Sequence, residues 1–347
     1  MPHETPAWGK IDNVVVMPAR VRTLLASYPE LTAVLVAAIL GLWVRRPFAW
    51  LAGHEGINVL LAVLVFATAV TIEPAALRRL RGDWRPLLAA LAAGVTLLPV
   101  LSWAVSWMVA AGPVRDGVLA LGLAPCEIAS VATTAMAVGD AALSAGVLIG
   151  STVIAVAFAG PILTLEAGHA GVRPGGIIVN LAVVVALPLA VGIGLRADVA
   201  PTARVPGAAI LAAASRVLAT ARAQRVASVT ATIAVAALVA LIAAEVRLSA
   251  NYAVVSAALA VFLAGSALLG RLLGARTRPS AATALLLTTS MRDFAIAAGL
   301  AAAAFGPAAA APLGLYGILV LVWGTAVAGL LRQRSAARLM RAPAKNP

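Results

Sequence analysis

Ten stretches of about twenty mostly apolar residues follow one another along the chain. A stretch of this length crosses a bilayer as an α-helix, which satisfies its own backbone hydrogen bonds in lipid. Of the 347 residues, 62% are hydrophobic and 11% are charged, whereas soluble proteins carry about 25% charged residues. The sequence therefore predicts an all-α membrane protein. The expected spans are residues 31–50, 57–76, 86–109, 115–137, 141–167, 175–195, 226–244, 252–273, 281–304 and 311–331.

Basic residues indicate how these spans are oriented. With the N-terminus placed inside, twenty Arg and Lys residues lie in inner segments and five lie in outer segments. Because cytoplasmic loops are enriched in positive charge, both termini are expected in the cytoplasm. The net charge of +13 is then a topology signal, so the lipid bilayer is the expected partner and nucleic acid is not. The Ala- and Arg-rich composition favours a bacterial inner (plasma) membrane.

The fourth and ninth spans contain residues that a helix in lipid does not favour. Pro125 lacks a backbone donor and is soon followed by Glu127, and Gly139-Asp140 makes a second break. In the ninth span the interruption is Ser290-Met291-Arg292-Asp293. Broken helices occur in membranes only where they face protein or a water-filled cavity, and secondary transporters build their binding sites there. The pattern predicts a transporter.

The positions of the breaks also predict an internal repeat. Ten spans divide into two sets of five, and the broken span is the fourth of each set. An odd number of spans turns the second set upside down, as in inverted-repeat transporters. The expected segments are a cytoplasmic N-terminal segment (1–30), a first repeat (31–195), a cytoplasmic connector (196–225), a second repeat (226–331) and a basic cytoplasmic tail (332–347).

The ionisable side chains inside the spans are the first candidates for function. A carboxylate at the centre of a membrane helix costs about 2.5–3.5 kcal/mol, so Glu127 is expected to be hydrated, paired or protonated. Arg292 stays charged at any accessible pH and needs a carboxylate, carbonyl oxygens or an anionic substrate. Its expected partner is Glu127 or Asp140, although Asp140 also stands at an N-cap position. Asp293 follows Arg292 and points elsewhere on a regular helix.

Neutral polar side chains near the breaks widen the candidate set. Ser130, Thr134 and Ser144 carry hydroxyls that either bind a ligand or bond back to their own helix. Cys126 is either a soft ligand or a small buried residue. The three histidines are scattered, so neither a metal cluster nor a catalytic triad is predicted. The chain is not expected to be an enzyme or to hold a cofactor.

The stretch from Pro125 to Ser144 resembles the bile acid:sodium symporter family, whose fourth helix reads Pro-Gly-Gly-Thr-x-Ser-Asn and later Gly-Asp-x-Ala-Leu-Ser. The end of the second span, Thr71-Ile72-Glu73-Pro74, followed by Leu77-Arg78-Arg79, is also similar. The resemblance implies a panel-like bundle packed on a core bundle, and transport of a small organic anion by alternating access. The residues that match the fourth-helix pattern without a gap are Pro125, Ser130, Thr134, Gly139, Asp140, Ala142, Leu143 and Ser144.

The chain departs from this family at the positions that hold sodium. In the fourth and fifth helices, Cys126-Glu127-Ile128 replaces Gly-Gly-Thr, Val131 replaces an asparagine and Leu148 replaces a threonine ligand. In the ninth helix, Thr288 stands at the position of the family's sodium-binding glutamate, and Arg292 stands at the position of a glutamine ligand.

Two side chains, Ser130 and Ser144, remain as a residual sodium site. We infer from these changes that Arg292 stands in for a cation. Transport is then either uncoupled from sodium or driven by protons through Glu127, which leaves Na⁺ and H⁺ as the candidate coupling ions.

Two other functions fit part of the pattern. Arsenite permeases share the ten-helix plan and a Pro-Cys in the fourth helix, and Pro125-Cys126, Phe294–Ala297 and Phe305-Gly306 are similar to them. A thiolate is a suitable ligand for a soft metalloid, so arsenite efflux through Cys126 is one alternative. The other is a membrane receptor that kept the fold and lost transport, which the missing sodium ligands favour.

Overall fold

The computed structural model describes residues 29–72, 84–167, 174–196, 208–245 and 251–341, and within these ranges the chain is helical and contains no β-strand. The expected all-α class is therefore correct. Most of the N-terminal segment, the Glu73-Pro74 and Leu77–Arg79 motifs, the start of the connector and the end of the tail lie outside the described residues.

The first half of the chain, up to the connector, contains eleven helical elements among these residues. They are α2 (Pro29–Trp43), α3 (Arg45–Ala52), α4 (Gly56–Ala69), α6 (Trp84–Val95), α7 (Leu97–Ser106), α8 (Pro113–Leu123), α9 (Ala129–Met136), α10 (Ala141–Ala167), α11 (Pro174–Leu181), the π-helical turn η2 (Ala182–Ala186) and α12 (Leu187–Leu195).

The second half begins with the connector helix. Its described elements are α13 (Ala208–Leu218), α14 (Ala221–Glu245), α15 (Asn251–Gly274), α16 (Pro279–Ser290), α17 (Phe294–Phe305), the 3-10 turn η3 (Pro307–Ala310) and α18 (Ala311–Arg341).

Six helices of the described chain are long and apolar enough to cross a membrane, and one bent pair is a seventh candidate. The other expected spans are divided into shorter helices or, as with α4, extend toward residues that the structure does not describe. The structure thus shows a helical membrane protein, while the exact count of ten spans in two inverted repeats stays a prediction.

Two expected boundaries are wrong. The span predicted over 31–50 is not one helix, because α2 and α3 meet at an angle of 99°. Pro47 stands in the first turn of α3 and cannot donate to the carbonyl of Trp43 one turn earlier, which interrupts the helical hydrogen bonds. After the bend, Arg45 Nε donates to the Ala244 carbonyl of α14 at 3.1 Å. In the connector, α13 ends at Leu218, and α14 begins at Ala221 rather than at the predicted 226.

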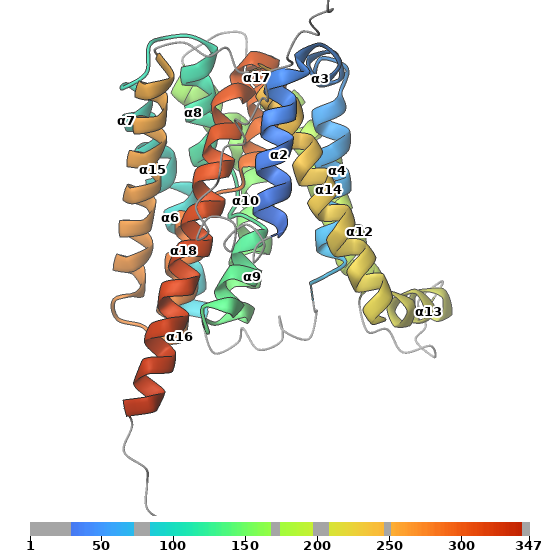
Figure 1. Ribbon diagram of the computed structural model, residues 1–347, viewed down its shortest axis with the longest axis vertical. Coiled ribbons are helices and arrows are strands. Elements are labelled where there is room, and N and C mark those ends of the chain that lie inside the picture. The colour runs from blue at the N-terminus through green and yellow to red at the C-terminus, as the bar shows by residue number, and fades with distance from the viewer. Residues whose placement is uncertain (1–28, 73–83, 168–173, 197–207, 246–250, 342–347) are drawn as a thin grey trace, which may run out of the picture.

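The helices pack in two groups (Figure 1). In one group, α14 packs against α2, α3 and α4, and α4 also packs against α12. In the other group, α8 packs against α7, α10 and α17, while α15 packs against α7 and α16. We call the second group the core group; the division into a panel and a core that the family resemblance implies stays a prediction. The core group contains both broken helices, α8–α9 and α16–α17.

Candidate functional site

The two broken helices cross each other at their breaks. Pro125 cannot continue α8, which ends at Leu123, and α9 starts only at Ala129. In the ninth span, α16 ends at Ser290 and α17 starts at Phe294. Both interruptions lie where the sequence predicts them.

Backbone hydrogen bonds join the two breaks as a short antiparallel pair. Glu127 N donates to Met291 O at 2.8 Å, and Asp293 N donates to Pro125 O at 2.9 Å. Cys126 and Arg292 therefore stand opposite each other as a bridged pair. The crossing satisfies backbone groups that the breaks would otherwise leave unpaired in the membrane interior.

This pairing sorts the site residues onto two faces. In extended backbone, successive side chains point to opposite sides, so Cys126 and Arg292 lie on one face and Glu127 and Asp293 lie on the other. The ion pair expected between Arg292 and Glu127 is absent among the described residues, since alternation separates their side chains. The expected pairing of Arg292 with a fourth-span carboxylate is thus wrong.

Arg292 is buried, with 4% of its surface exposed. Its guanidinium donates to the Ala124 carbonyl at the end of α8, and its Nε has no hydrogen-bond partner. Arg292 also lines a small cavity of about 20 Å³ together with Leu123, Ser151 and apolar residues of α6, α7 and α10. The positively charged guanidinium of Arg292 therefore borders a cavity in the core group, and at least its Nε donor has no hydrogen-bond partner.

Cys126 shares this face and is fully buried. Its backbone N donates to Ser151 Oγ at 3.1 Å, and Ser130 Oγ donates to its sulfur at 3.9 Å. Within the part of the chain that the structure describes, no three His, Cys, Asp or Glu side chains gather in a way that could hold a metal ion.

The opposite face carries the two carboxylates. Asp293 is fully buried and caps α17, since its Oδ1 accepts from Ile296 N at 2.8 Å. Glu127 is also buried, with 5% of its surface exposed. One oxygen of each carboxylate, Glu127 Oε2 and Asp293 Oδ2, is buried without a hydrogen-bond partner.

The hydroxyl candidates form a separate group beside the crossing. Thr134 Oγ1 donates to Ser144 Oγ at 3.4 Å, which brings α9 and α10 together. Ser130 lies one turn before Thr134 on the same helix, and all three are buried. Thr288 bonds back to the Ala284 carbonyl at 2.8 Å, so its hydroxyl donates within its own helix.

Asp140 lies outside the crossing. Its Oδ1 accepts from Leu143 N at 3.0 Å, which is the predicted N-cap of α10. Its other oxygen lies 3.7 Å from a guanidinium nitrogen of Arg278, a largely exposed side chain. Asp140 therefore starts a helix near the surface and is not the partner of Arg292.

Tyr316 of α18 is a site residue that the sequence did not reveal. It is fully buried, its hydroxyl donates to Ser290 O at 3.1 Å, and it accepts from Arg292 N at 3.4 Å. Trp323, two turns later, donates from Nε1 to Ser290 Oγ at 3.1 Å. Both lie in an unbroken apolar helix, so no local pattern marks them, and only the fold brings them to the break.

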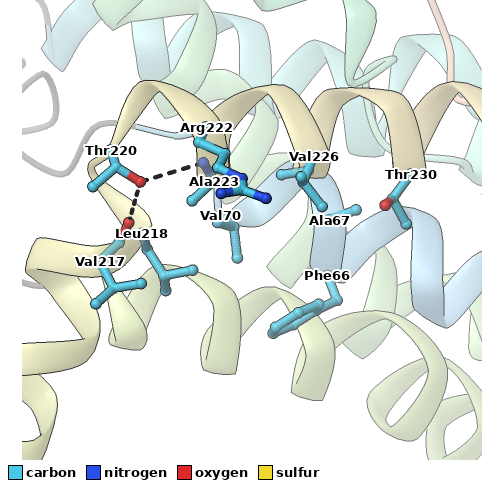
Figure 2. Close-up of a pocket in the computed structure, with 11 residues that line it drawn as sticks. Phe66, Ala67, Val70, Val217, Leu218, Thr220, Arg222, Ala223, Val226 and Thr230 are labelled. Carbon is cyan, nitrogen blue, oxygen red and sulfur yellow. Dashed lines mark hydrogen bonds between the residues drawn. The ribbon is translucent and has the colours of Figure 1, made fainter.

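A larger cavity lies away from the crossing. It has a volume of about 420 Å³ and is open between α4, α13 and α14. Figure 2 shows Phe66 of α4 and Arg222 of α14 among the residues that line this cavity. None of the predicted site residues lines it.

Two broken helices that cross at buried charges, in a helical membrane protein, define the architecture of a transport protein. The sequence matches the model of the sodium bile acid symporter family over residues 58–256, which is more than half of the chain, and the chain belongs to this family. No curated protein matches the sequence. The family match includes the first broken helix and ends within α15, so Thr288 and Arg292 lie beyond it.

Proposed function

We propose that this protein is a secondary active transporter that moves a small organic anion by alternating access. The observation that carries the proposal is Arg292, a buried guanidinium at the crossing that lacks a carboxylate partner on its own face and leaves Nε unbonded. A buried polar atom without a hydrogen-bond partner is costly. An anion that enters beside Arg292 would supply the missing acceptor.

The position of Arg292 supports a binding role over a purely structural one. The carbonyl end of α8 carries a partial negative charge that attracts cations, and the bond to Ala124 O uses this effect. That bond occupies only part of a guanidinium with five donors. Arg292 also borders the small cavity near Leu123 and Ser151, and we place the anionic group of the substrate on this side of the crossing.

The changed ligands argue against sodium as the driving ion. Sodium prefers several oxygen ligands, and the position of the family's glutamate carries Thr288, whose hydroxyl donates to its own helix. Thr134 and Ser144 donate and accept between themselves. We propose that Arg292 takes the place of a sodium charge and that protons, through Glu127, drive any coupled transport.

The proposal also includes the orientation of the protein in the membrane and the membrane in which it lies. The distribution of Arg and Lys favours a cytoplasmic position for both termini, and the composition favours a bacterial inner membrane.

The test is uptake into proteoliposomes that contain the full-length protein. Sulfonates from methanesulfonate to taurocholate are suitable probes, because they stay ionised and cannot carry protons across the bilayer by themselves. We expect saturable uptake of at least one of them, driven by an inward proton gradient. Uptake that follows a sodium gradient and ignores a pH gradient would contradict the proposed coupling, and equal uptake into empty liposomes would contradict the proposed function.

Metalloid efflux is the alternative that Cys126 can test. The thiol is the single cysteine of the chain, it is fully buried, and its neighbour Ser130 already donates to it. We expect Cys126→Ser to leave arsenite tolerance unchanged in a host that lacks its own efflux system, because one enclosed sulfur makes a poor site. Loss of tolerance in this variant, with Cys126→Ala giving the same loss at equal expression, would favour arsenite transport.

A further inference from the structure

The carboxylates of Glu127 and Asp293 lie on the same face of the crossing, although they belong to different broken helices. In the antiparallel pair, Glu127 stands opposite Met291 and Asp293 stands opposite Pro125, so the two carboxylates are diagonal neighbours. Diagonal neighbours are about 7–8 Å apart at the backbone, within reach of long side chains.

Each carboxylate keeps one buried oxygen without a hydrogen-bond partner. Asp293 uses Oδ1 to cap α17 and leaves Oδ2 free. Glu127 leaves Oε2 free. Two acceptors of this kind have no donor to share, and an unsatisfied buried polar atom costs about 1–3 kcal/mol.

We propose that Glu127 and Asp293 form a carboxylate pair that binds one proton, the coupling ion of transport. The proton sits on one carboxyl, whose O–H donates to the free oxygen of the other. One proton thus satisfies both unpartnered oxygens, whereas two ionised carboxylates side by side repel each other. This inference rests on the proposed transport function and adds a second site to it.

The surrounding charges support a single proton. Arg292 carries one positive charge on the opposite face, and the pair carries two negative charges when both groups are ionised. One bound proton makes the crossing neutral before the anion arrives. The other titratable groups near the pair are Cys126, which shares the face of Arg292, and Tyr316 of α18, whose hydroxyl is bonded to Ser290 O.

The arrangement also separates the two cargoes. The anion meets Arg292 on one face of the crossing and the proton meets the carboxylate pair on the other. The backbone of the two breaks lies between them. Movement of the crossing in alternating access would carry both sites together, which gives a physical basis for coupling.

Thermal unfolding of the full-length protein in detergent tests proton binding without any substrate. From about pH 5 to about pH 9, the melting temperature of the wild type should fall by more than about 3 °C as the proton leaves and two like charges remain. Glu127→Gln and Asp293→Asn each keep the shape and remove one charge, so their profiles should be flat. Glu55→Gln, which removes an exposed carboxylate, should retain the wild-type fall. Wild-type and variant profiles that run parallel would overturn the proposal.

Transport separates this inference from the proposed function. In vesicles loaded with unlabelled taurocholate or another sulfonate that the wild type carries, both variants should still exchange labelled anion, because exchange needs no net proton movement. They should lose accumulation under a pH gradient. Loss of exchange as well would place the pair in the anion site and refute the proton role, whereas pH-independent uptake by an active wild type would refute coupling.

Discussion

Replacing Arg292 with alanine is expected to lower anion uptake by at least about 100-fold. Removing one member of a buried charge pair costs about 3–5 kcal/mol, and each 1.4 kcal/mol is a tenfold change. Here the pair forms between Arg292 and the substrate anion, so the loss should appear in transport. The measurement is initial uptake of the sulfonate probe into proteoliposomes at matched protein content.

Two further variants make this result specific. Arg292→Lys keeps the charge but loses the planar fork of donors, so uptake should recover only in part. Arg225→Ala removes an exposed basic residue of α14 and should leave uptake unchanged. Wild-type uptake by Arg292→Ala would show that the guanidinium only holds the end of α8.

Replacing Gly122 with alanine is expected to destabilise the protein by about 1–3 kcal/mol, as overpacking does in a tight core. Gly122 lies in α8 where that helix packs against α7. An added methyl group would lie 2.7 Å from the Leu98 carbonyl oxygen and would overlap the Ser102 hydroxyl. Ser102 cannot easily turn away, because it donates to Pro99 O at 2.8 Å.

Gly329→Ala is the matched control for this change. Gly329 is also in a helix, α18, but a methyl group there meets nothing within 4 Å. The substitution should stabilise the protein by about 0.5–1 kcal/mol, since alanine favours a helix over glycine. Melting temperature and the monodisperse peak in size-exclusion chromatography measure both variants. Equal stability of the two would show that α7 and α8 are not packed as closely as the structure places them.

The helical fold and the breaks were predictable because they depend on local chemistry. Length and apolarity indicate spans, and Pro125 and the Arg292-Asp293 pair mark positions where a lipid-facing helix is unfavourable. The bend between α2 and α3 was not predicted, because apolar residues continue on both sides of it. Pro47 is the local residue that indicates the interruption. The start of α14 at Ala221 is not evident from the sequence, because Arg222 and Arg225 are typical of a connector outside the membrane.

The candidate site was predictable only as a set of residues. The sequence indicates Glu127, Arg292 and Asp293 but contains nothing about how two breaks pair in space. The antiparallel register decides that Arg292 faces away from Glu127 and that Glu127 and Asp293 share a face. Tyr316 enters the site through packing of a distant helix, which no local pattern shows.

The melting temperature of the purified protein against sodium concentration tests the central claim most directly, with choline at equal ionic strength as the control. A ligand that binds only the folded state raises stability by RT ln(1 + [L]/Kd), so even weak sites appear at high concentration. We predict equal curves in sodium and choline, because Arg292 already supplies the positive charge and Thr288 replaces the anionic ligand. A rise that sodium alone produces would mean that Ser130, Ser144 and backbone carbonyls still bind sodium, and would contradict this account.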